Sequence, residues 1–575
     1  MTHTNSWCLM PLINSFSTKD IKRPSVFAMW DVVIMVLIIG ALFLISSAAS
    51  DMLVQYELGD PIVIDLSPER LPYYALRTIL RMFIALFLSL LCAFVVGGIA
   101  AKNTLAEKII LPAIDVMQSI PVIGFLEVSF LWIIAAFKGS FLGPELVSIF
   151  AVFVSQVWNL ILCYYQSLKA VPRELDEVMR IYHLTPWQRF FRLEVPHAAP
   201  ALIWNAMLSL SAGWFFVVAG EALTIANHDV ALPGIGSYIA VATAQGDFQA
   251  VYYAIGCLFA VIMLYDQLLF RPLNYWLLSR ENPGSGKANW VYRLVTGSRV
   301  WGGIKRLLSW LTQGRQGQKK FKYYRKKPQW LGAALGYGVL LWASYAVLQV
   351  LLDMGSVLTW GEVETALMLG AYTAFRVFVL VLLCCIVWVP VGIYLGMHEK
   401  ASNIFQPVIQ FLAAFPPNML YPLVGSLVIA KGYNPNIWLS PLIVLGTQWY
   451  ILFNVISGVK ALPHDLLMMA KSLHLSQFQL CKKVILPGIL PSLLTGVITA
   501  AGGAWNTSII AEMAEWNGEV VYADGLGAFI MEASRNAQPD MVCLGVAVMC
   551  LYVLLINRVV WLPLYRMIDR RYGGR

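Results

Sequence analysis

Long apolar stretches, separated by short polar segments, dominate the pattern of this chain. Each stretch runs for about 20 residues, which is the length that a helix needs to cross the hydrocarbon core of a bilayer. The pattern predicts an all-α, polytopic membrane protein with about twelve transmembrane helices. These helices are predicted to begin near Phe27, Ala75, Ile109, Val147, Ala201 and Val251, and then near Trp330, Ala371, Ile404, Trp438, Ile489 and Val542.

One pattern of residues occurs twice in the chain. The stretch at 171–200, VPRELDEVMRIYHLTPWQRFFRLEVPHAAP, matches LPHDLLMMAKSLHLSQFQLCKKVILPGILP at 462–491, at a constant offset of 291. Positions paired at this offset include Trp158 with Trp449 and Glu221 with Glu512, and an upstream offset of 295 pairs Arg81 with Arg376. Because each copy holds six predicted helices, an even number, the repeat predicts two parallel six-helix halves related by a pseudo-two-fold axis along the membrane normal.

The repeat also predicts how the chain is divided. Residues 1–72 form a cytoplasmic N-terminal arm, a first transmembrane helix and an outer loop, and residues 73–280 form the first repeat. Residues 281–328 form a basic cytoplasmic linker, and residues 329–575 form the second repeat with its own leading helix.

Composition and charge agree with a membrane protein. The chain has 575 residues, of which 59% are hydrophobic and 13% charged, so an ordinary soluble globular protein is excluded. Residues 282–352 carry twelve Lys and Arg and no acidic residue, which exceeds the whole net charge of +9. Because cytoplasmic loops retain cations, both termini are predicted to be cytoplasmic. The basicity therefore reflects topology and does not indicate nucleic-acid binding.

A short polar loop lies between two apolar stretches in each half. In the first copy, 174–182 and 186–192 are predicted to form two short helices joined near His183, the second ended by Pro196. Trp187 and Phe478 occupy equal positions and are large apolar side chains suited to a pocket in a partner. The candidate docking residues are Glu174, Glu177, Arg180, His183, Trp187, Asp465, Lys471, His474 and Phe478.

This loop, followed by a proline and an apolar helix, resembles the coupling-helix motif of binding-protein-dependent ABC importer permeases. The resemblance covers both copies and is strongest over 158–221 and 449–512, and the phrases Thr78-Ile79-Leu80-Arg81 and Ala504-Trp505 are most similar to the nitrate, sulfonate, taurine and bicarbonate branch. It implies a type I importer fold with two permease units fused in one chain. Two departures are that His183 and His474 stand where the family has Gly, and that Met468 replaces a carboxylate.

The resemblance also implies partners. They are two ABC ATPase subunits, or a fused pair, an extracytoplasmic solute-binding protein, and the lipid of an inner membrane. The chain has no Walker A loop, because the nearest match, Gly284-Ser285-Gly286-Lys287-Ala288, lacks the first Gly and the hydroxyl after the Lys. ATP and Mg are therefore expected in separate ATPase subunits, and the sequence predicts no cofactor, metal site or enzymatic activity in this chain.

Candidate residues for a solute pathway lie on the helices that follow Pro200 and Pro491. The first offers aromatic residues where the second offers polar ones, so a pathway between the halves would have unequal walls. Glu127 lies within an apolar stretch where the second copy has Pro422, and it argues against assuming an anionic solute. The candidate pathway residues are Gln118, Glu127, Trp214, Phe215, Asn418, Trp505, Asn506, Thr507 and Ser508.

Two arginines and two glutamates fall at similar predicted depths near the outer surface. Buried ions in a membrane pair or face water, so Arg81 is predicted to pair with Glu221, and Arg376 with Glu512, as braces of an outer gate. The alternative is that the arginines extend to the interface and have no directed partner.

Two function classes stay open at this level. The first is the permease of an ATP-driven importer, with a small anion such as nitrate, bicarbonate or a sulfonate as the solute implied by the resemblance. The second is an ion-coupled secondary transporter with two parallel six-helix halves. A secondary transporter needs no docking loop in each half, so the repeated loops favour the importer.

Overall fold

The structure is a computed structural model of the chain. It describes residues 40, 46–47, 50–51, 54–55, 63–118, 121–122, 132–182, 184–225, 228–273, 275–276, 291–292, 358–536 and 538–572. Glu127, His183, the predicted helix near Trp330 and almost all of the helix near Phe27 and of the linker at 281–328 lie outside the described residues.

The first half is a bundle of helices with one short hairpin. Its elements are η2 (Pro68–Arg70), α2 (Leu71–Cys92), η3 (Ala93–Gly97), α3 (Gly98–Lys102), α4 (Thr104–Met117), α6 (Leu142–Lys169), α7 (Arg173–Ile181), α8 (Pro186–Arg189), η4 (Phe190–Glu194), α9 (Val195–Glu221), β1 (Ala222–Ile225), β2 (His228–Ala231), α10 (Ile235–Ala244), α11 (Phe248–Tyr265) and η5 (Asp266–Phe270).

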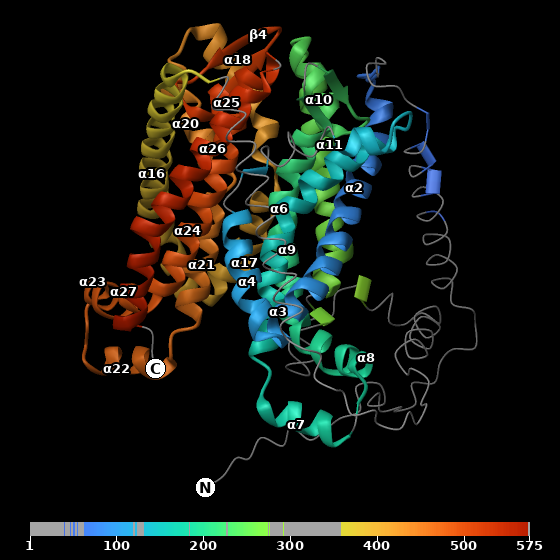
Figure 1. The fold of residues 1–575 in the computed structure, drawn as a ribbon. Coiled ribbons are helices and arrows are strands. Elements are labelled where there is room, and N and C mark those ends of the chain that lie inside the picture. Colours follow the sequence, from blue (N-terminus) through green and yellow to red (C-terminus); the bar gives the residue numbers. More distant parts are fainter. Residues whose placement is uncertain are drawn as a thin grey trace.

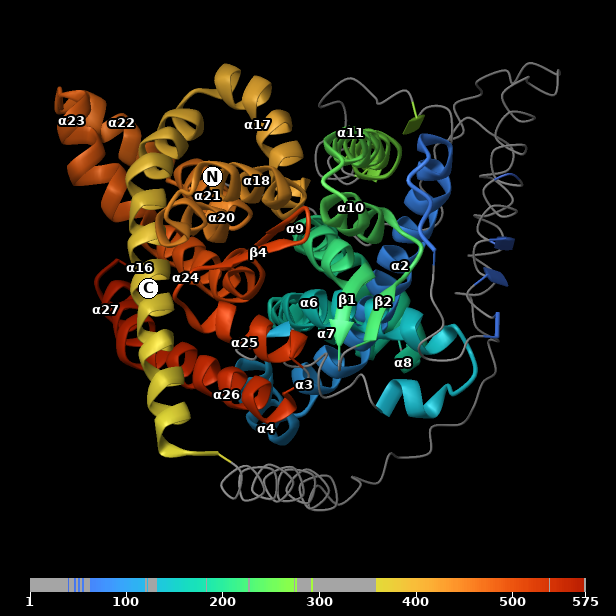
Figure 2. The ribbon, with the colours of Figure 1, turned by 90° about the horizontal axis from the view of Figure 1, so that it is seen from above.

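The second half repeats this order and lies beside the first (Figures 1 and 2). Its elements are α16 (Trp360–Met397), α17 (Glu399–Ala414), η6 (Pro417–Leu420), α18 (Tyr421–Lys431), α19 (Pro435–Trp438), α20 (Ser440–Leu445), α21 (Gln448–Lys460), α22 (His464–Ser472), α23 (Gln477–Leu480), η7 (Cys481–Ile485), α24 (Leu486–Ala511), β3 (Met513–Trp516), β4 (Glu519–Tyr522), α25 (Leu526–Arg535), α26 (Pro539–Ile556), η8 (Asn557–Trp561) and α27 (Leu562–Tyr572).

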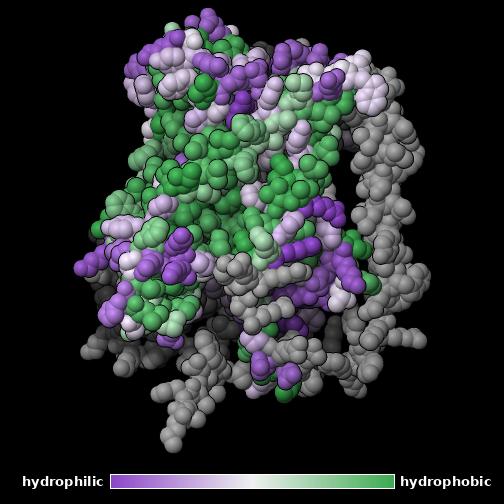
Figure 3. All heavy atoms as spheres, turned by 90° about the vertical axis from the view of Figure 1, so that its left-hand side faces the viewer, coloured by the Kyte–Doolittle hydropathy of each residue, from purple (hydrophilic) through white to green (hydrophobic). Residues whose placement is uncertain are grey.

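Six helical segments among the described residues are long and apolar enough to cross a membrane. A seventh is present if Pro435–Leu445, which holds α19 and α20, counts as one span with α21 despite the 42° bend between them. Two of the predicted helices, near Ile109 and Ile404, form α4 and α17, which at 14 and 16 residues are shorter than a full crossing. Figure 3 shows apolar side chains in a broad band across the face of the second half, with polar side chains above and below. The described part is therefore a polytopic helical membrane fold.

The polar loops continue into the long helices without a break. Pro196 was predicted to end a short helix, and this is wrong: α8, the π-helical turn η4 and α9 form one continuous run. Proline lacks an N–H and its ring clashes with the carbonyl four residues before it. A π-helical turn directly before Pro196 changes the hydrogen-bond spacing there, and η7 stands in the same relation to Pro487.

Two β-hairpins interrupt the all-α pattern that the sequence predicts. In the first, β1 pairs antiparallel with β2, and in the second, β3 pairs with β4 in the equivalent register. Asn517 and Gly518 turn the second hairpin at φ values of 53° and 78°, a pair of residues that favours this geometry. Both hairpins lie at the end of the molecule opposite α7, α8, α22 and α23 (Figure 1). We call these the hairpin end and the loop end.

Direct contacts join the halves. The Asn418 side-chain amide donates to the Phe215 carbonyl at 3.1 Å, and the Val122 N–H donates to the Asn506 side-chain oxygen at 2.9 Å. At the hairpin end, the rings of Phe248 and Trp516 lie 4.2 Å apart between centroids. The largest apolar core of each half also extends across the interface, since Phe215 packs into the core of the second half, and Met419 and Trp516 into that of the first.

The close packing of α21 on α24 gives a stability prediction. A Cβ added at Gly496 would lie 2.8 Å from the Tyr450 carbonyl oxygen, whereas one at Gly502 on the same helix meets nothing within 4 Å. Gly496→Ala is expected to destabilise the chain by about 1–3 kcal/mol through overpacking. Gly502→Ala is expected to be neutral or slightly stabilising. Chemical denaturation of the chain in detergent micelles measures both, and equal effects would contradict the packing described.

Candidate functional site

A buried network of charges closes the hairpin end of the first half. The Arg81 guanidinium contacts Glu145 and Glu221, each at 2.6 Å, and all three side chains are fully buried. Arg81 donates to both oxygens of Glu145, and Arg77, which is 1% exposed, shares one of them. The network joins α2, α6 and α9, and Arg81 also donates to the Pro233 carbonyl at 3.0 Å. The predicted pair of Arg81 with Glu221 is therefore present, with Glu145 as a second partner.

Each glutamate of the predicted pairs is held by backbone N–H groups. Gly236 donates its N–H to Glu221 at 2.7 Å, and Gly527 donates to Glu512 at the same distance. A Cβ at Gly234 or Gly525 would lie 2.2 Å from the neighbouring carboxyl group, so only glycine fits there. The carboxylates are thus placed by the start of α10 and α25, through interactions that favour the ionised form.

The second half has a smaller network. Arg376 contacts Glu512 at 2.6 Å, as predicted, and its side chain is 12% exposed. Its second partner is the Asn436 amide oxygen at 3.1 Å, and Asn436 in turn donates to Asp524 at 2.7 Å. Asn436 is the residue at offset 291 from Glu145. The repeat therefore places a neutral amide where the first half has a buried carboxylate.

Sequence reasoning missed Arg77, Glu145 and Asn436. The available signal was the constant offset, which pairs Glu145 with Asn436 at the start of the helices predicted near Val147 and Trp438. A charged residue in an apolar stretch needs a partner, so Glu145 qualified as a candidate partner for an arginine. The roles of the two clusters as an outer gate stay predictions.

A cavity of about 650 Å³ lies between the two halves. It is bounded by helices of both, chiefly α6 and α9 of the first half and α21 and α24 of the second. Of the predicted pathway residues, those that line it are Gln118, Phe215, Trp505, Asn506 and Thr507. The predicted contrast between an aromatic Phe215 and a polar Asn506 at equivalent positions is present in its wall.

Three other candidates lie elsewhere. Trp214 is 2% exposed and packs its ring against Tyr265 inside the first half. The Ser508 hydroxyl is fully buried and donates to the Trp505 carbonyl. Asn418 donates to the Phe215 carbonyl across the interface between the halves. None of these three is among the residues that line the cavity, because a helix presents only one face to it. Their role in a solute pathway stays a prediction.

The loop end carries two compact pairs of short helices. Thr185 and Ser476 form capping boxes with Gln188 and Gln479 at the start of α8 and α23. His474 adopts φ 50°, so it makes the left-handed turn that the departure from Gly required. Trp187 is 57% exposed and Phe478 is 73% exposed.

The remaining candidate docking residues fall on the same helices or outside the described side chains. Glu174, Glu177 and Asp465 are exposed on α7 and α22. The backbones of Arg180 and Lys471 belong to these helices, and their side chains lie outside what the structure describes, as does His183 entirely. Both loops therefore present exposed surface at one end of the molecule.

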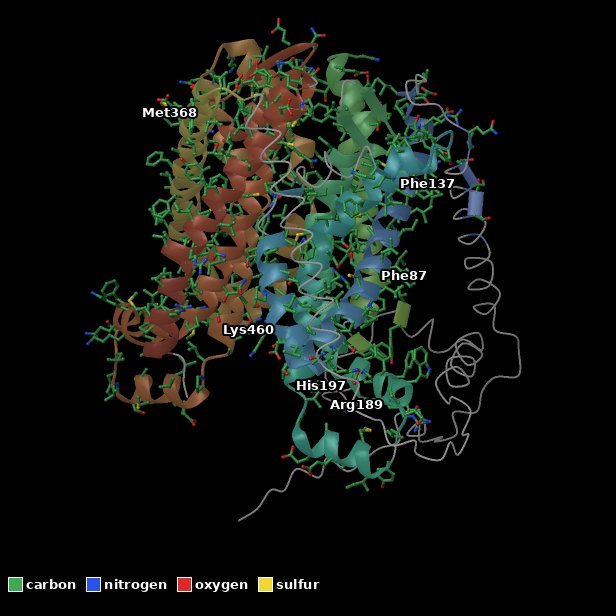
Figure 4. All side chains as sticks on the ribbon, viewed as in Figure 1. Phe87, Phe137, Arg189, His197, Met368 and Lys460 are labelled. Carbon is green, nitrogen blue, oxygen red and sulfur yellow. The ribbon has the colours of Figure 1, made fainter. Side chains whose placement is uncertain are left out.

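The two loops differ in their attachment to the bundle. Glu194, nearly fully buried, contacts Lys102 at 2.8 Å and Arg189 at 3.0 Å. The equivalent position at offset 291 is Ile485, which has no charge. Figure 4 shows Arg189 close to the loop end of the first half. An ion cluster therefore ties only the first loop to its helices, within the described residues.

The unequal clusters at the hairpin end give a second prediction. Glu145→Ala leaves two buried guanidiniums short of a partner, and the expected cost is about 3–5 kcal/mol of unfolding free energy. Asn436→Ala removes a neutral hydrogen bond at the equivalent position, with an expected cost of about 1 kcal/mol. Denaturation of both variants in the same detergent compares them, and equal losses would contradict the asymmetry.

Comparison with known proteins agrees with the repeat. Residues 93–271 and 388–574 each match the family described as "Binding-protein-dependent transport system inner membrane component". The taurine transport system permease protein TauC of Escherichia coli is 29% identical over 169 residues, which cover 29% of this chain and 58% of that protein.

Two further relatives are permease proteins named for bicarbonate and nitrate. The bicarbonate transport system permease protein CmpB of Synechococcus elongatus is 30% identical over 182 residues, covering 31% of this chain and 62% of that protein. The nitrate import permease protein NrtB of Leptolyngbya laminosa is 30% identical over 185 residues, which cover 32% of this chain and 63% of that protein. The chain thus spans about three fifths of the length of these relatives. Since the two family matches together cover more than half of the chain, it belongs to the family of binding-protein-dependent transport system inner membrane components and contains two copies of its domain.

Proposed function

We propose that this chain is the transmembrane permease of an ATP-driven ABC importer, with two permease units fused in one polypeptide. The observation that carries the proposal is the combination of one cavity between the halves with an exposed helical loop at the equivalent place in each half. The cavity is the solute pathway, and the loops are the surfaces on which separate ATPases dock.

The shape of the long helices supports coupling between loop and pathway. The run from Gln477 to Ala511 is continuous over 35 residues, or about 52 Å at 1.5 Å per residue. One end carries Phe478, the middle lines the cavity through Thr499, and the other end leads directly to Glu512. Because the helix has no break, movement of the docked loop displaces the wall of the cavity.

The partners of this complex follow from the same arrangement. Two ATPase subunits, identical or fused as a pair, bind ATP and Mg and engage the loop end. An extracytoplasmic solute-binding protein delivers solute at the hairpin end. In this proposal the chain resides in the inner membrane with both termini in the cytoplasm, and it catalyses no reaction itself.

The names of the relatives suggest taurine, bicarbonate or nitrate as cargo. A small anion of this kind is therefore the first hypothesis for the solute. The aromatic and uncharged residues of the cavity wall favour a different class of solute.

An ion-coupled secondary transporter has less support. Such a transporter usually binds its driving ion at a carboxylate within the spans, and in the part of the chain that the structure describes, Glu145, Glu221 and Glu512 are each held by an arginine. ATP-independent, gradient-driven uptake by the purified chain in liposomes would establish this alternative and exclude the importer.

Docking of the ATPases gives a third prediction. Phe478→Ala removes the most exposed aromatic side chain of the second loop, and the expected result is at least a tenfold weaker association with the ATPase, because an aromatic anchor contributes about 2 kcal/mol or more. The control is Tyr433→Ala, a partly exposed aromatic between α18 and α19. Affinity purification from the native membrane, with ATPase recovery as the readout, checks this. Full recovery with both Phe478→Ala and Trp187→Ala would contradict docking at the loops.

Blocking the cavity gives a fourth prediction. Gly502 lines the cavity and has open space around it, so Gly502→Trp fills the cavity without a clash. The expected result is that ATP-dependent uptake is lost, while the ATPase still copurifies with the chain. Gly256→Trp on α11 is the matched control, since Gly256 also has open space and does not line the cavity. Unchanged transport with Gly502→Trp would show that the cavity is not the pathway.

A further inference from the structure

We propose that the cavity between the halves binds a planar, uncharged organic solute with both donor and acceptor groups, such as an aminated nitrogen heterocycle, in place of a small inorganic or sulfonate anion. This inference rests on the proposed function, because it takes the cavity to be the solute pathway. It is carried by three properties of the wall: its aromatic surface, its hydrogen-bonding groups and its lack of charged side chains.

Five indole rings line the cavity, and both halves contribute them. Trp158 of α6 and Trp449 of α21 occupy equivalent positions of the repeat, and Trp204, Trp505 and Trp561 complete the set. Flat aromatic faces favour the stacking of a planar ring. A volume of about 650 Å³ is within the range of sites for organic ligands and far exceeds the space that an ion such as nitrate fills.

Each of three side-chain amides of the wall is anchored by an N–H group that donates inside the protein. Asn159 donates to the Ser209 hydroxyl at 3.0 Å, and Asn454 donates to the Tyr450 carbonyl at 2.8 Å. Asn205 donates to a carbonyl of its own helix at 2.9 Å. The amide oxygens of these three residues accept no hydrogen bond from any described residue, so they remain as acceptors for a bound solute.

Three hydroxyl groups of the wall also donate inside the protein. Ser155 donates to the Val152 carbonyl at 2.7 Å, and Thr499 donates to the Thr495 oxygen of the backbone at 2.9 Å. Thr495 in turn donates to the Pro491 carbonyl at 3.0 Å. With their protons used by helix carbonyls, these hydroxyls present lone pairs. Together with the indole N–H groups of the five tryptophans, the wall therefore offers both acceptors and donors, which a heterocycle with ring nitrogens and N–H groups can satisfy together.

Charge gives an independent argument. Among the described residues, none of those that line the cavity is Lys, Arg, His, Asp or Glu. The segments at 119–120 and 123–131, which flank the lining residue Val122, contain no Lys, Arg or His in the sequence. An anion placed here would lose hydration without a cation to offset the loss. A neutral ring with N–H groups avoids that cost.

Ligand binding to the whole chain tests the inference. The full chain in lipid nanodiscs is titrated with cytosine, an uncharged planar ring that carries an amino group and a ring N–H, and with ethanesulfonate at equal ionic strength. Because a ligand of the folded state raises the unfolding temperature, cytosine is expected to raise Tm with increasing concentration, and ethanesulfonate is not. Stabilisation by ethanesulfonate alone, or by neither compound, would overturn the proposal.

Substitutions at Asn454 report on the direction of the hydrogen bond. Asn454→Asp keeps an acceptor oxygen and adds negative charge, so cytosine binding is expected to persist or strengthen. Asn454→Leu removes the acceptor, and the expected loss is about fivefold in affinity. Loss of cytosine binding in Asn454→Asp, with the fold intact by thermal unfolding, would contradict the acceptor role.

Substitutions of tryptophan report on stacking. Trp449→Leu is expected to weaken cytosine binding by about tenfold or more. Trp438→Leu is the control, because Trp438 is 51% exposed on α19 and does not line the cavity. Equal affinities of the two variants would contradict a role for the cavity indoles.

The outcome is separable from that of the proposed function. If cytosine binds and Gly502→Trp abolishes its binding, while no ATPase copurifies, the importer proposal fails and the solute class stands. If the ATPase copurifies and ethanesulfonate alone binds, the solute class fails and the importer proposal stands.

Discussion

The structure depends on buried arginine–carboxylate contacts at the hairpin end. Arg81 with Glu221, and Arg376 with Glu512, fix the ends of α9 and α24, the two helices that start in the loops and pass the cavity. A buried ion pair is stable only when its geometry is good and further hydrogen bonds satisfy its remaining atoms. The glycine N–H groups at the start of α10 and α25 meet that requirement. Loop, cavity and hairpin end are thereby joined by one continuous helix in each half.

The two halves share this arrangement of helix and ion pair, and they differ in the number of charged contacts that hold it. In the first half, Glu145 and Arg77 extend the buried network, and Glu194 ties the loop to its helices. In the second half, Asn436 and Ile485 stand at the equivalent positions, so both clusters are smaller.

The sequence was sufficient to predict the repeat, the helical membrane fold, the paired loops and the pairing partners Glu221 and Glu512, because each leaves a pattern of spacing or an isolated charge in an apolar stretch. It did not predict the hairpins, since four-residue strands that follow an apolar helix have no periodicity of their own. The continuation of the helix through Pro196 was missed because a π-helical turn has no residue signature. Trp214 was misplaced because a helix that is apolar on every side gives no indication of which face meets the cavity.

The central claim is that movement at the loop end reaches the hairpin end through rigid helices. Spin labels at Ala170 and Ala461, exposed and equivalent at the loop end, and at Glu69 and Glu519, exposed toward the hairpin end, measure both distances in the complex with its ATPase. When a nonhydrolysable ATP analogue closes the ATPases, the account predicts that the first distance shortens while the second lengthens. A shortened first distance with an unchanged second distance would contradict it.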